Sequence, residues 1–330
     1  MTKPAQTPAT GLKGFVGYRP ELKVLDCTIR DGGLMNNHHF ADQIVKAVYT
    51  ACVEAGIDYM EVGYKASRKI IVPGEHGAWK YCLEDDVRRI VGDNPTGLKL
   101  SVMADAERTD YHEDIPPKSQ SVIDMVRVAT YISQIPAALE MVKDAHDKGY
   151  ETTLNLMAVS TVPEYELNEG LELLAASETK AIYVVDSFGV LYSEQVQYLV
   201  RKYLHHCKAA GKEVGIHTHN NLQLAFANTI EAIVLGANML DATMAGLGRG
   251  AGNCPMELLI GFLHNPKYNL RPVLRCVQDT IEPMRARLKW GFDLPYMLTG
   301  FLNEHPRSAI KFNDAPTKGD IVDFYNLIWE

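Results

Sequence analysis

Short apolar segments alternate with longer amphipathic segments along most of the chain. The apolar segments have the length and composition of β-strands, and there are eight: residues 22–27, 59–62, 98–103, 122–128, 152–159, 182–185, 213–216 and 239–242. The amphipathic segments carry apolar residues at helical spacing and include residues 41–55, 84–91, 135–148, 163–176, 193–210 and 222–235. Several of these predicted helices are followed by glycine, which commonly ends a helix.

Strands that alternate with helices predict a parallel sheet. A doubly wound sheet usually has about five or six strands, so eight strands favour a closed (β/α)8 TIM barrel. We therefore predict a lead-in at residues 1–20, a catalytic barrel at residues 21–265 and a small helical region at residues 266–330. The longest irregular segments, residues 63–81 and 104–121, are predicted lids or binding loops.

The composition excludes several classes of protein. The chain has 330 residues, 46% of them hydrophobic, which argues against disorder. The formal net charge is −8 and basic residues form no cluster, so we expect neither a nucleic-acid nor a membrane partner. The six cysteines form no CxxC pair, and the first residues lack the apolar core of a signal peptide, so we expect free thiols in a cytoplasmic protein.

Polar residues fall at the same end of almost every predicted strand. In a barrel, the carboxyl ends of the strands carry the reactive groups. The residues in question are Arg30, Asp31, Glu61, Arg127, Asn155, Ser187, His217, His219 and Asn253. Among them, Arg30, Arg127, Asn155 and Ser187 are the predicted substrate-binding residues.

His217 and His219 are the most specific pair. Residues two apart on a strand point to one face, so both imidazoles can reach one ion. Asp31, after the first strand, is the natural third ligand, and two imidazoles with a carboxylate suit a divalent metal with open positions for a substrate. The alternative interpretation is two hydrogen-bonded histidines at a strand end.

Arg30 offers a planar set of donors beside Asp31. It can hold a carboxylate, or polarise a carbonyl oxygen next to the metal, or form a structural ion pair. Glu61 is a candidate acid or base, although pairing with Arg30 is the favoured interpretation. The glycine-rich segment at residues 246–252 allows close approach to a ligand but equally suits a mobile lid, and it lacks the Lys-Ser/Thr of a P-loop.

Three segments resemble the signatures of the DRE-TIM metallolyase superfamily: LDCTIRDGG at 25–33, IHTHNN at 216–221 and GLGRGAGNCPMEL at 246–258. That superfamily includes 3-hydroxy-3-methylglutaryl-CoA lyase and the isopropylmalate and homocitrate synthases. VRVAT at 126–130 and VVDSFG at 184–189 are most similar to its 4-hydroxy-2-oxovalerate aldolase branch.

The resemblance implies a divalent metal, Mn²⁺ or Mg²⁺, held by Asp31, His217 and His219, with Asn253 approaching it. Arg30 would stabilise the oxygen of an enolate. The implied reaction cleaves a 4-hydroxy-2-oxo acid to pyruvate and an aldehyde through a metal-stabilised enolate, or runs in reverse. A homodimer is expected, while a partner dehydrogenase cannot be assumed.

One position departs from the aldolase branch. Leu34 stands where that branch carries a catalytic histidine. His38 and His39 are therefore the predicted sources of a general base, and Tyr296 and His305 from the C-terminal region are further candidates.

Two other functions stay open. A Claisen-type synthase or acyl-CoA lyase would use Arg249 for a CoA phosphate, and a barrel without catalysis would serve as a binding protein. The Asp31, His217 and His219 set argues against the second, because a scaffold does not need a metal site.

Overall fold

The computed structural model describes residues 19–72, 74–317 and 319–330. In this part of the chain, eight parallel strands close into a barrel in chain order, with β1 paired to β8. They are β1 Lys23–Asp26, β2 Tyr59–Tyr64, β3 Lys99–Asp105, β4 Met125–Thr130, β5 Glu151–Leu156, β6 Ala181–Asp186, β7 Glu213–Thr218 and β8 Met239–Ala242. The predicted (β/α)8 barrel is confirmed, while nearly all of the predicted lead-in lies outside the described residues.

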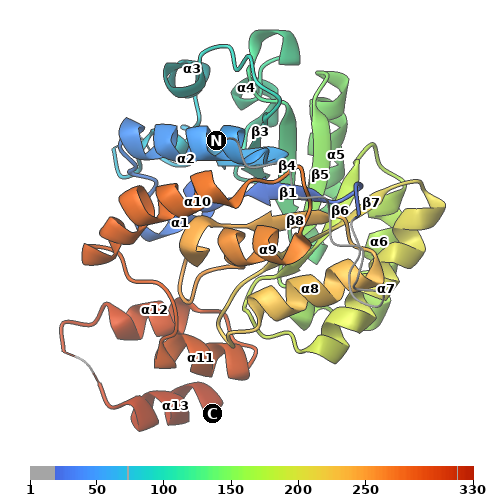
Figure 1. Ribbon diagram of the computed structural model, residues 1–330. Coiled ribbons are helices and arrows are strands. Elements are labelled where there is room, and N and C mark those ends of the chain that lie inside the picture. The colour runs from blue at the N-terminus through green and yellow to red at the C-terminus, as the bar shows by residue number, and fades with distance from the viewer. Residues whose placement is uncertain (1–18, 73, 318) are drawn as a thin grey trace, which may run out of the picture.

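Helices cover the outside of the barrel (Figure 1). They are α2 Asp42–Ala55, α3 Glu84–Val91, α5 Ile135–Asp147, α6 Glu164–Ala175, α7 Ser193–Ala209, α8 Ala225–Leu235 and α9 Met256–Leu263, with the short α1 Thr28–Gly32 and α4 Tyr111–Asp114 in the loops. Gly56 follows α2, where glycine was predicted to end the helix, and its conformation shows why glycine is needed there. Gly56 has φ +72°, and a Cβ there would lie 2.5 Å from the carbonyl oxygen of Lys267.

The largest differences from the predicted strand boundaries, three residues each, occur in two strands. The fourth begins at Met125 rather than at residue 122, because Val122 and Ile123 pack into the core before the strand pairing starts. The fifth ends at Leu156 rather than at residue 159. Ala158 takes a left-handed conformation, φ +52°, and starts a 3-10 turn whose Val159 is also buried. Burial without pairing therefore explains both differences.

The core has two layers. A large apolar cluster fills the space between the strands and the outer helices. A smaller cluster fills the barrel interior and includes Leu25, Tyr59, Met125, Tyr183 and Met239. No helix among the described residues is both long and apolar enough to cross a membrane.

The C-terminal region begins with a helix that belongs to the barrel wall. α10 (Leu270–Cys276) lies beside α2 in Figure 1 and packs against it. After Cys276 the regular helix changes to a π turn at Val277–Ile281 and a 3-10 turn at Glu282–Ala286. Pro283, which lacks an N–H group, lies where the regular pattern is lost.

Three further helices follow: α11 Leu294–Phe301, α12 Arg307–Asn313 and α13 Ile321–Trp329. Figure 1 shows them, in red, gathered at one corner of the molecule away from α3 and α4. Side-chain hydrogen bonds connect this region to the barrel loops: Asn221 Nδ2 donates to the carbonyl of Tyr296 at 3.2 Å, and Ser160 Oγ lies 2.7 Å from Asn303 Oδ1. The region is therefore held against the carboxyl ends of the strands.

Candidate active site

The carboxyl end of the barrel brings Asp31, His217 and His219 together. α1 follows β1 directly and holds Asp31, whose backbone N–H donates to the carbonyl of Cys27 at 2.9 Å. His217 lies in β7 and His219 just beyond it, with their rings 5.0 Å apart. Asp31 Oδ2 lies 3.2 Å from His217 Nε2 and 4.0 Å from His219 Nε2. All three side chains are buried.

Several polar atoms at this point have no hydrogen-bond partner among the described residues. They are both carboxylate oxygens of Asp31, Nε2 of His217 and His219, and Oδ1 of Asn253. A buried polar atom without a partner costs about 1–3 kcal/mol, so a group of five indicates a missing ligand. Gly248 leaves room for the group, because a Cβ there would lie 2.2 Å from Asn253 Nδ2 and 3.6 Å from the Asp31 carboxyl carbon.

Hydrogen bonds on the far side of each ring fix the imidazoles. Nδ1 of His217 lies 2.9 Å from Asp241 Oδ2, and Nδ1 of His219 lies 3.0 Å from the carbonyl oxygen of Asp186. Both oxygens can only accept, so each Nδ1 donates, and in the neutral ring each Nε2 has a lone pair toward Asp31. Burial lowers the pKa of His217, but hydrogen bonding to Asp241 and Asp31 outweighs it and raises that pKa, so a metal would displace a proton there. Burial, with the positive charge nearby, lowers the pKa of His219 to about 3. A neutral imidazole is the form that binds a metal.

This donor set fits a divalent metal. Asp31, His217 and His219 each offer one ligand atom, and these atoms lie within 4.8 Å of one another. Cys27, His217 and Asp241 satisfy the same spacing. Burial raises the pKa of the Cys27 thiol well above its ordinary value, and Asp241 already pairs with an arginine. The thiol therefore stays protonated, and the first set is the better candidate.

A network of buried charged side chains lies in the barrel interior next to this site. Arg30 Nε donates to Glu61 Oε2 at 2.7 Å, which confirms the predicted pairing. Arg127 bridges the same Glu61 oxygen, at 3.0 Å, to Asp241 Oδ2, at 2.6 Å. Asp241 in turn accepts from His217. The network therefore connects Arg30, which lies beside Asp31, to His217, whose ring faces Asp31 from the other side.

Arg127 does not lie where a substrate-binding residue is expected. It is 0% exposed, stacks on the ring of Tyr183 at 4.4 Å and does not line the cavity at the barrel mouth. Its contacts are with Glu61, Asp241, Tyr183 and Cys27 in the barrel interior. Its position is that of a residue that orients the network rather than one that touches a ligand.

A cavity of about 420 Å³ opens beside the two histidines. Five predicted site residues line it: Arg30, Asn155, Ser187, His217 and His219. Leu34, Tyr64, Asp105, Arg108, Arg249, His305 and Arg307 contribute to the same wall. Asp31 and Asn253 lie directly behind the histidines, at the closed end of the site.

His38 and His39, the predicted sources of a base, do not line this cavity. His38 is buried behind the turn after β1, with its ring edge-on to Tyr64 and its Nδ1 only 2.1 Å from where a Cβ of Gly33 would be. Burial and neighbouring cations lower its pKa to about 3. His39 is exposed, and its Nε2 lies 3.3 Å from the carbonyl oxygen of Glu75.

The C-terminal region places His305 in the cavity and Tyr296 outside it. The His305 ring packs edge-on against Phe188 and lines the same wall as Leu34. Burial, with Arg249 and Arg307 nearby, lowers its pKa to about 4, so the ring is neutral at pH 7. Tyr296 lines an adjoining cavity on the other side of the glycine-rich segment.

Some residues of the site were not predicted, and they differ in whether the sequence carries a signal for them. Asp241 is a charged residue inside the short apolar strand β8, and that contrast was a usable signal. Arg108 lies in the loop after β3 and Arg307 begins α12. Nothing local distinguishes these two arginines from ordinary exposed ones.

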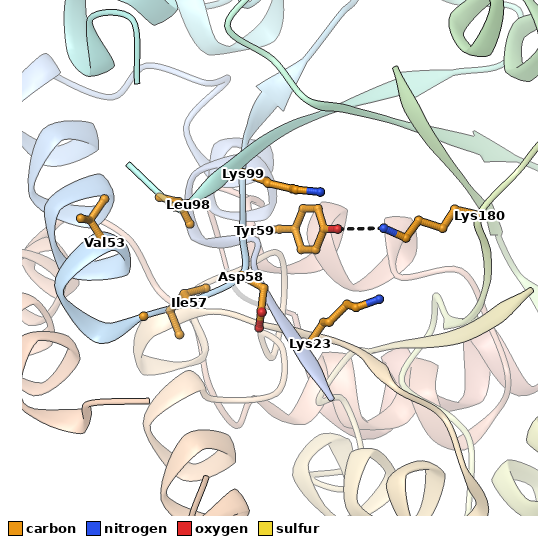
Figure 2. A pocket seen from close by; sticks show the side chains of 10 residues that line it. Lys23, Val53, Ile57, Asp58, Tyr59, Leu98, Lys99 and Lys180 are labelled. Atoms are coloured by element: carbon orange, nitrogen blue, oxygen red, sulfur yellow. Dashed lines mark hydrogen bonds between the residues drawn. The ribbon is translucent and has the colours of Figure 1, made fainter. Parts of the chain in front are cut away.

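The opposite end of the barrel has a second cavity of about 420 Å³ with a different character. Figure 2 shows Lys23, Lys99 and Lys180 reaching toward the ring of Tyr59, whose hydroxyl lies 3.2 Å from Lys180 Nζ. Here the charges are paired: Lys99 and Lys180 with Glu151, and Lys23 with Glu213. This end has the features of a stabilising ion-pair cluster.

Comparisons with known proteins identify the family of the chain. Residues 21–280 match the HMGL-like family. A 4-hydroxy-2-oxovalerate aldolase of Pelotomaculum thermopropionicum is 28% identical over 276 residues, 81% of this chain and 78% of that protein. An oxaloacetate decarboxylase of Mycobacterium tuberculosis is 31% identical over 251 residues, 73% of this chain and 69% of that protein.

Solved structures share the fold. The N-terminal domain of a Bacteroides vulgatus protein described as an aldolase matches with a TM-score of 0.75 at 29% identity, covering 88% of this chain and 96% of that domain. The HMG-CoA lyase of Bacillus subtilis matches with a TM-score of 0.67 at 18% identity, covering 81% of this chain and 95% of that one. The second likeness concerns the fold alone.

A TIM barrel with these donors at the carboxyl ends of its strands, and with relatives named as aldolases and a decarboxylase, is an enzyme of the lyase type. The chain belongs to the HMGL-like family. It is a DRE-TIM protein close to the aldolase branch, as the sequence signatures predicted.

Proposed function

We propose that this protein is a divalent-metal-dependent carbon–carbon lyase that cleaves a 4-hydroxy-2-oxo acid to pyruvate and an aldehyde, or joins the two. The observation that carries the proposal is the group of five buried donor atoms without partners, next to a cavity large enough for a small organic acid. Relatives named 4-hydroxy-2-oxovalerate aldolase support this reaction class.

Asp31, His217 and His219 would hold the metal, Mn²⁺ or Mg²⁺, with the Asn253 amide oxygen as a further ligand. A bound ion would supply Lewis acidity, drawing electrons from the carbonyl oxygen of a 2-oxo acid and so easing enolate formation. The histidine tautomers fixed by Asp241 and the Asp186 carbonyl support this assignment, since they keep each Nε2 available.

The chain's own residues would bind and orient the acid. Arg30 uses Nε for Glu61 and Nη1 for Asp31, and its remaining N–H groups can donate to the carbonyl oxygen that becomes negative. Ser187 Oγ already accepts a backbone N–H at 2.8 Å, so its hydroxyl hydrogen can serve a carboxylate. The Asn155 amide nitrogen can donate in the same way, because Thr153 occupies the amide oxygen.

His305 is the residue proposed to contact the aldehyde oxygen, which is the second oxygen that changes charge in the reaction. Its Nδ1 accepts the backbone N–H of Arg307 at 3.1 Å, so Nε2 carries the proton of the neutral ring. A neutral imidazole donor stabilises the charge that develops on an aldehyde oxygen during condensation. This role fits the departure at Leu34, whose side chain lines the cavity but cannot exchange a proton.

Decarboxylation of a 2-oxo acid is the second candidate. It breaks a carbon–carbon bond beside the same ketone without removing a hydroxyl proton, so an apolar Leu34 does not hinder it. The relative named oxaloacetate decarboxylase favours it further. Release of CO₂ from oxaloacetate, measured against Mn²⁺ alone, distinguishes this activity.

The decisive experiment is exchange of the methyl protons of pyruvate in D₂O with Mn²⁺, followed by proton NMR. We expect exchange that needs the metal and no CoA. Exchange only with CoA present would favour a synthase or acyl-CoA lyase. No exchange with pyruvate or other 2-oxo acids would contradict the proposal, because each direction of the reaction passes through the same enolate.

A further inference from the structure

The cavity wall beyond the metal ligands is unusually cationic. Arg108, from the loop after β3, Arg249, from the glycine-rich segment, and Arg307, from α12, all line it. The single carboxylate among the lining residues is Asp105, and burial raises its pKa. This local positive charge contrasts with the net charge of −8 for the whole chain.

These three arginines are not used to hold the fold together. Among the described residues, none of them forms an ion pair, and only Arg249 reaches a hydrogen-bond acceptor, the carbonyl oxygen of Ser187 at 3.5 Å. Arg30 differs, because it is paired with both Asp31 and Glu61. Guanidinium groups that face a cavity without partners are available for an anion.

One carboxylate cannot account for all of this charge. The carboxylate of a 2-oxo acid would lie by the ketone, near Arg30 and the metal ligands. Arg249 lies near both His219 and His305, while Arg108 and Arg307 line the exposed rim of the cavity, where they would face the other end of the substrate. Arg108 and Arg307 are exposed at the rim and Arg249 is half-buried, so a neutral aldehyde would leave three guanidinium groups at the cavity without an oxyanion to bind.

The segments that carry Arg249 and Arg307 are both anchored at the mouth of the barrel. Gly250, next to Arg249, packs against the ring of Tyr296, which fixes the glycine-rich segment against α11. The Asn303–Ser160 contact fixes the segment that carries Arg307. The lowered pKa of His305, to which burial, Arg249 and Arg307 all contribute, is consistent with a positive field at this place.

We propose that the aldehyde partner of the reaction carries an oxyanion, a carboxylate or a phosphate, which Arg108, Arg249 and Arg307 bind. This inference rests on the proposed aldolase function and names the substrate class of the same site. The planar donor groups of arginine suit either oxyanion, so the test separates the two.

The test measures condensation of pyruvate with matched aldehydes in the presence of Mn²⁺. One pair is 4-oxobutanoate and butanal, which differ in a terminal carboxylate, and the other is glyceraldehyde 3-phosphate and glyceraldehyde. We expect kcat/KM to be at least about tenfold higher for the charged member of one pair, and that pair identifies the oxyanion.

Variants then locate the effect. Arg307→Gln and Arg108→Gln should each reduce the charged-to-neutral ratio of kcat/KM by about tenfold, mainly through KM. Arg201→Gln, which changes an exposed arginine on α7, is the matched control and should leave the ratio as it is.

Equal kcat/KM for charged and neutral aldehydes in the wild type would overturn the inference, as would an unchanged ratio in both cavity variants. Pyruvate proton exchange separates this failure from failure of the proposed function. If exchange occurs without a preference for charged aldehydes, only the inference fails. If exchange is absent, the proposed function fails and the inference with it.

Discussion

Charged side chains lie at both ends of the barrel, but their hydrogen bonding differs between the two ends. At the amino end, Glu151 accepts hydrogen bonds from Lys180 and Tyr59 and pairs with Lys99. At the carboxyl end, the oxygens of Asp31 and Nε2 of His217 lack hydrogen bonds among the described residues. Asp31 pairs with Arg30 Nη1 at 3.1 Å, but a cluster of buried polar atoms without hydrogen bonds still raises the energy of the folded chain until a ligand binds. At the amino end Glu213 Oε2 is such an atom, so what distinguishes the carboxyl end is that several of these atoms converge on one point.

The largest effect is expected at the carboxyl end. Asp31→Asn removes the charged metal ligand, and turnover should fall by about 1000-fold or more, since Lewis acid catalysis supplies several kcal/mol. Metal content after gel filtration, measured by mass spectrometry, should fall with it. Stability without metal should also fall, because the variant loses the buried ion pair between Asp31 Oδ2 and Arg30 Nη1, which lie 3.1 Å apart, so metal content is compared at a temperature where both proteins are folded. Wild-type metal content in this variant would reject the site.

A smaller loss is expected at the cavity wall. His305→Ala should reduce kcat by about 100-fold, the usual effect of losing one donor to a developing oxyanion. His305→Gln keeps an N–H donor and should recover part of the loss. Metal content should stay at the wild-type level in both variants.

His38→Ala is the comparison for that measurement. His38 lies behind Gly33 and outside the cavity, so its removal should cost less turnover than removal of His305. A larger loss in His38→Ala, with metal and stability unchanged, would instead assign the proton transfer to His38.

The amino end should show the reverse behaviour. Glu151→Gln removes the negative charge between two lysines and should destabilise the protein by roughly 1–2 kcal/mol, with kcat/KM within about twofold of wild type. Thermal unfolding followed by circular dichroism measures the loss. A large loss of activity at unchanged stability would contradict the division between the two ends.

The same variant has a defined pH dependence. Burial raises the pKa of Glu151, but Lys180, Lys99 and Tyr59 outweigh it and lower the pKa from 4.5 to about 2. A depressed pKa contributes stability that is complete above 4.5 and is lost as the pH falls toward 2. The difference in Tm between wild type and Glu151→Gln should therefore shrink between pH 5 and pH 2.

The barrel and the meeting of Asp31, His217 and His219 could be predicted, because both follow from local sequence patterns. The alternation of strands and helices determined the topology, and the rule that reactive groups follow the strands located Asp31 and His217. Arg127 was misplaced by the same rule, since it lies within β4 and points into the interior rather than toward the mouth.

Other parts of the site depend on how distant loops fold. His38 is close to Arg30 in sequence, but left-handed conformations at Asn37 and His38 turn its ring behind Gly33. Arg108 and Arg307 meet at one cavity although long stretches of chain separate them. Such convergence has no local signature, because loop conformation depends on contacts with the rest of the protein.

The way the C-terminal region closes the cavity bears on how such enzymes diversify. All of the proposed metal donors belong to the barrel, while His305, Arg307 and Ile310 come from one short stretch of chain that rests on the loops through contacts such as Asn303–Ser160. Recombination or insertion within that stretch would exchange one wall of the cavity and leave every metal donor in place. A chimera that carries the corresponding segment of a relative should therefore inherit the relative's choice of aldehyde while retaining this protein's own metal chemistry.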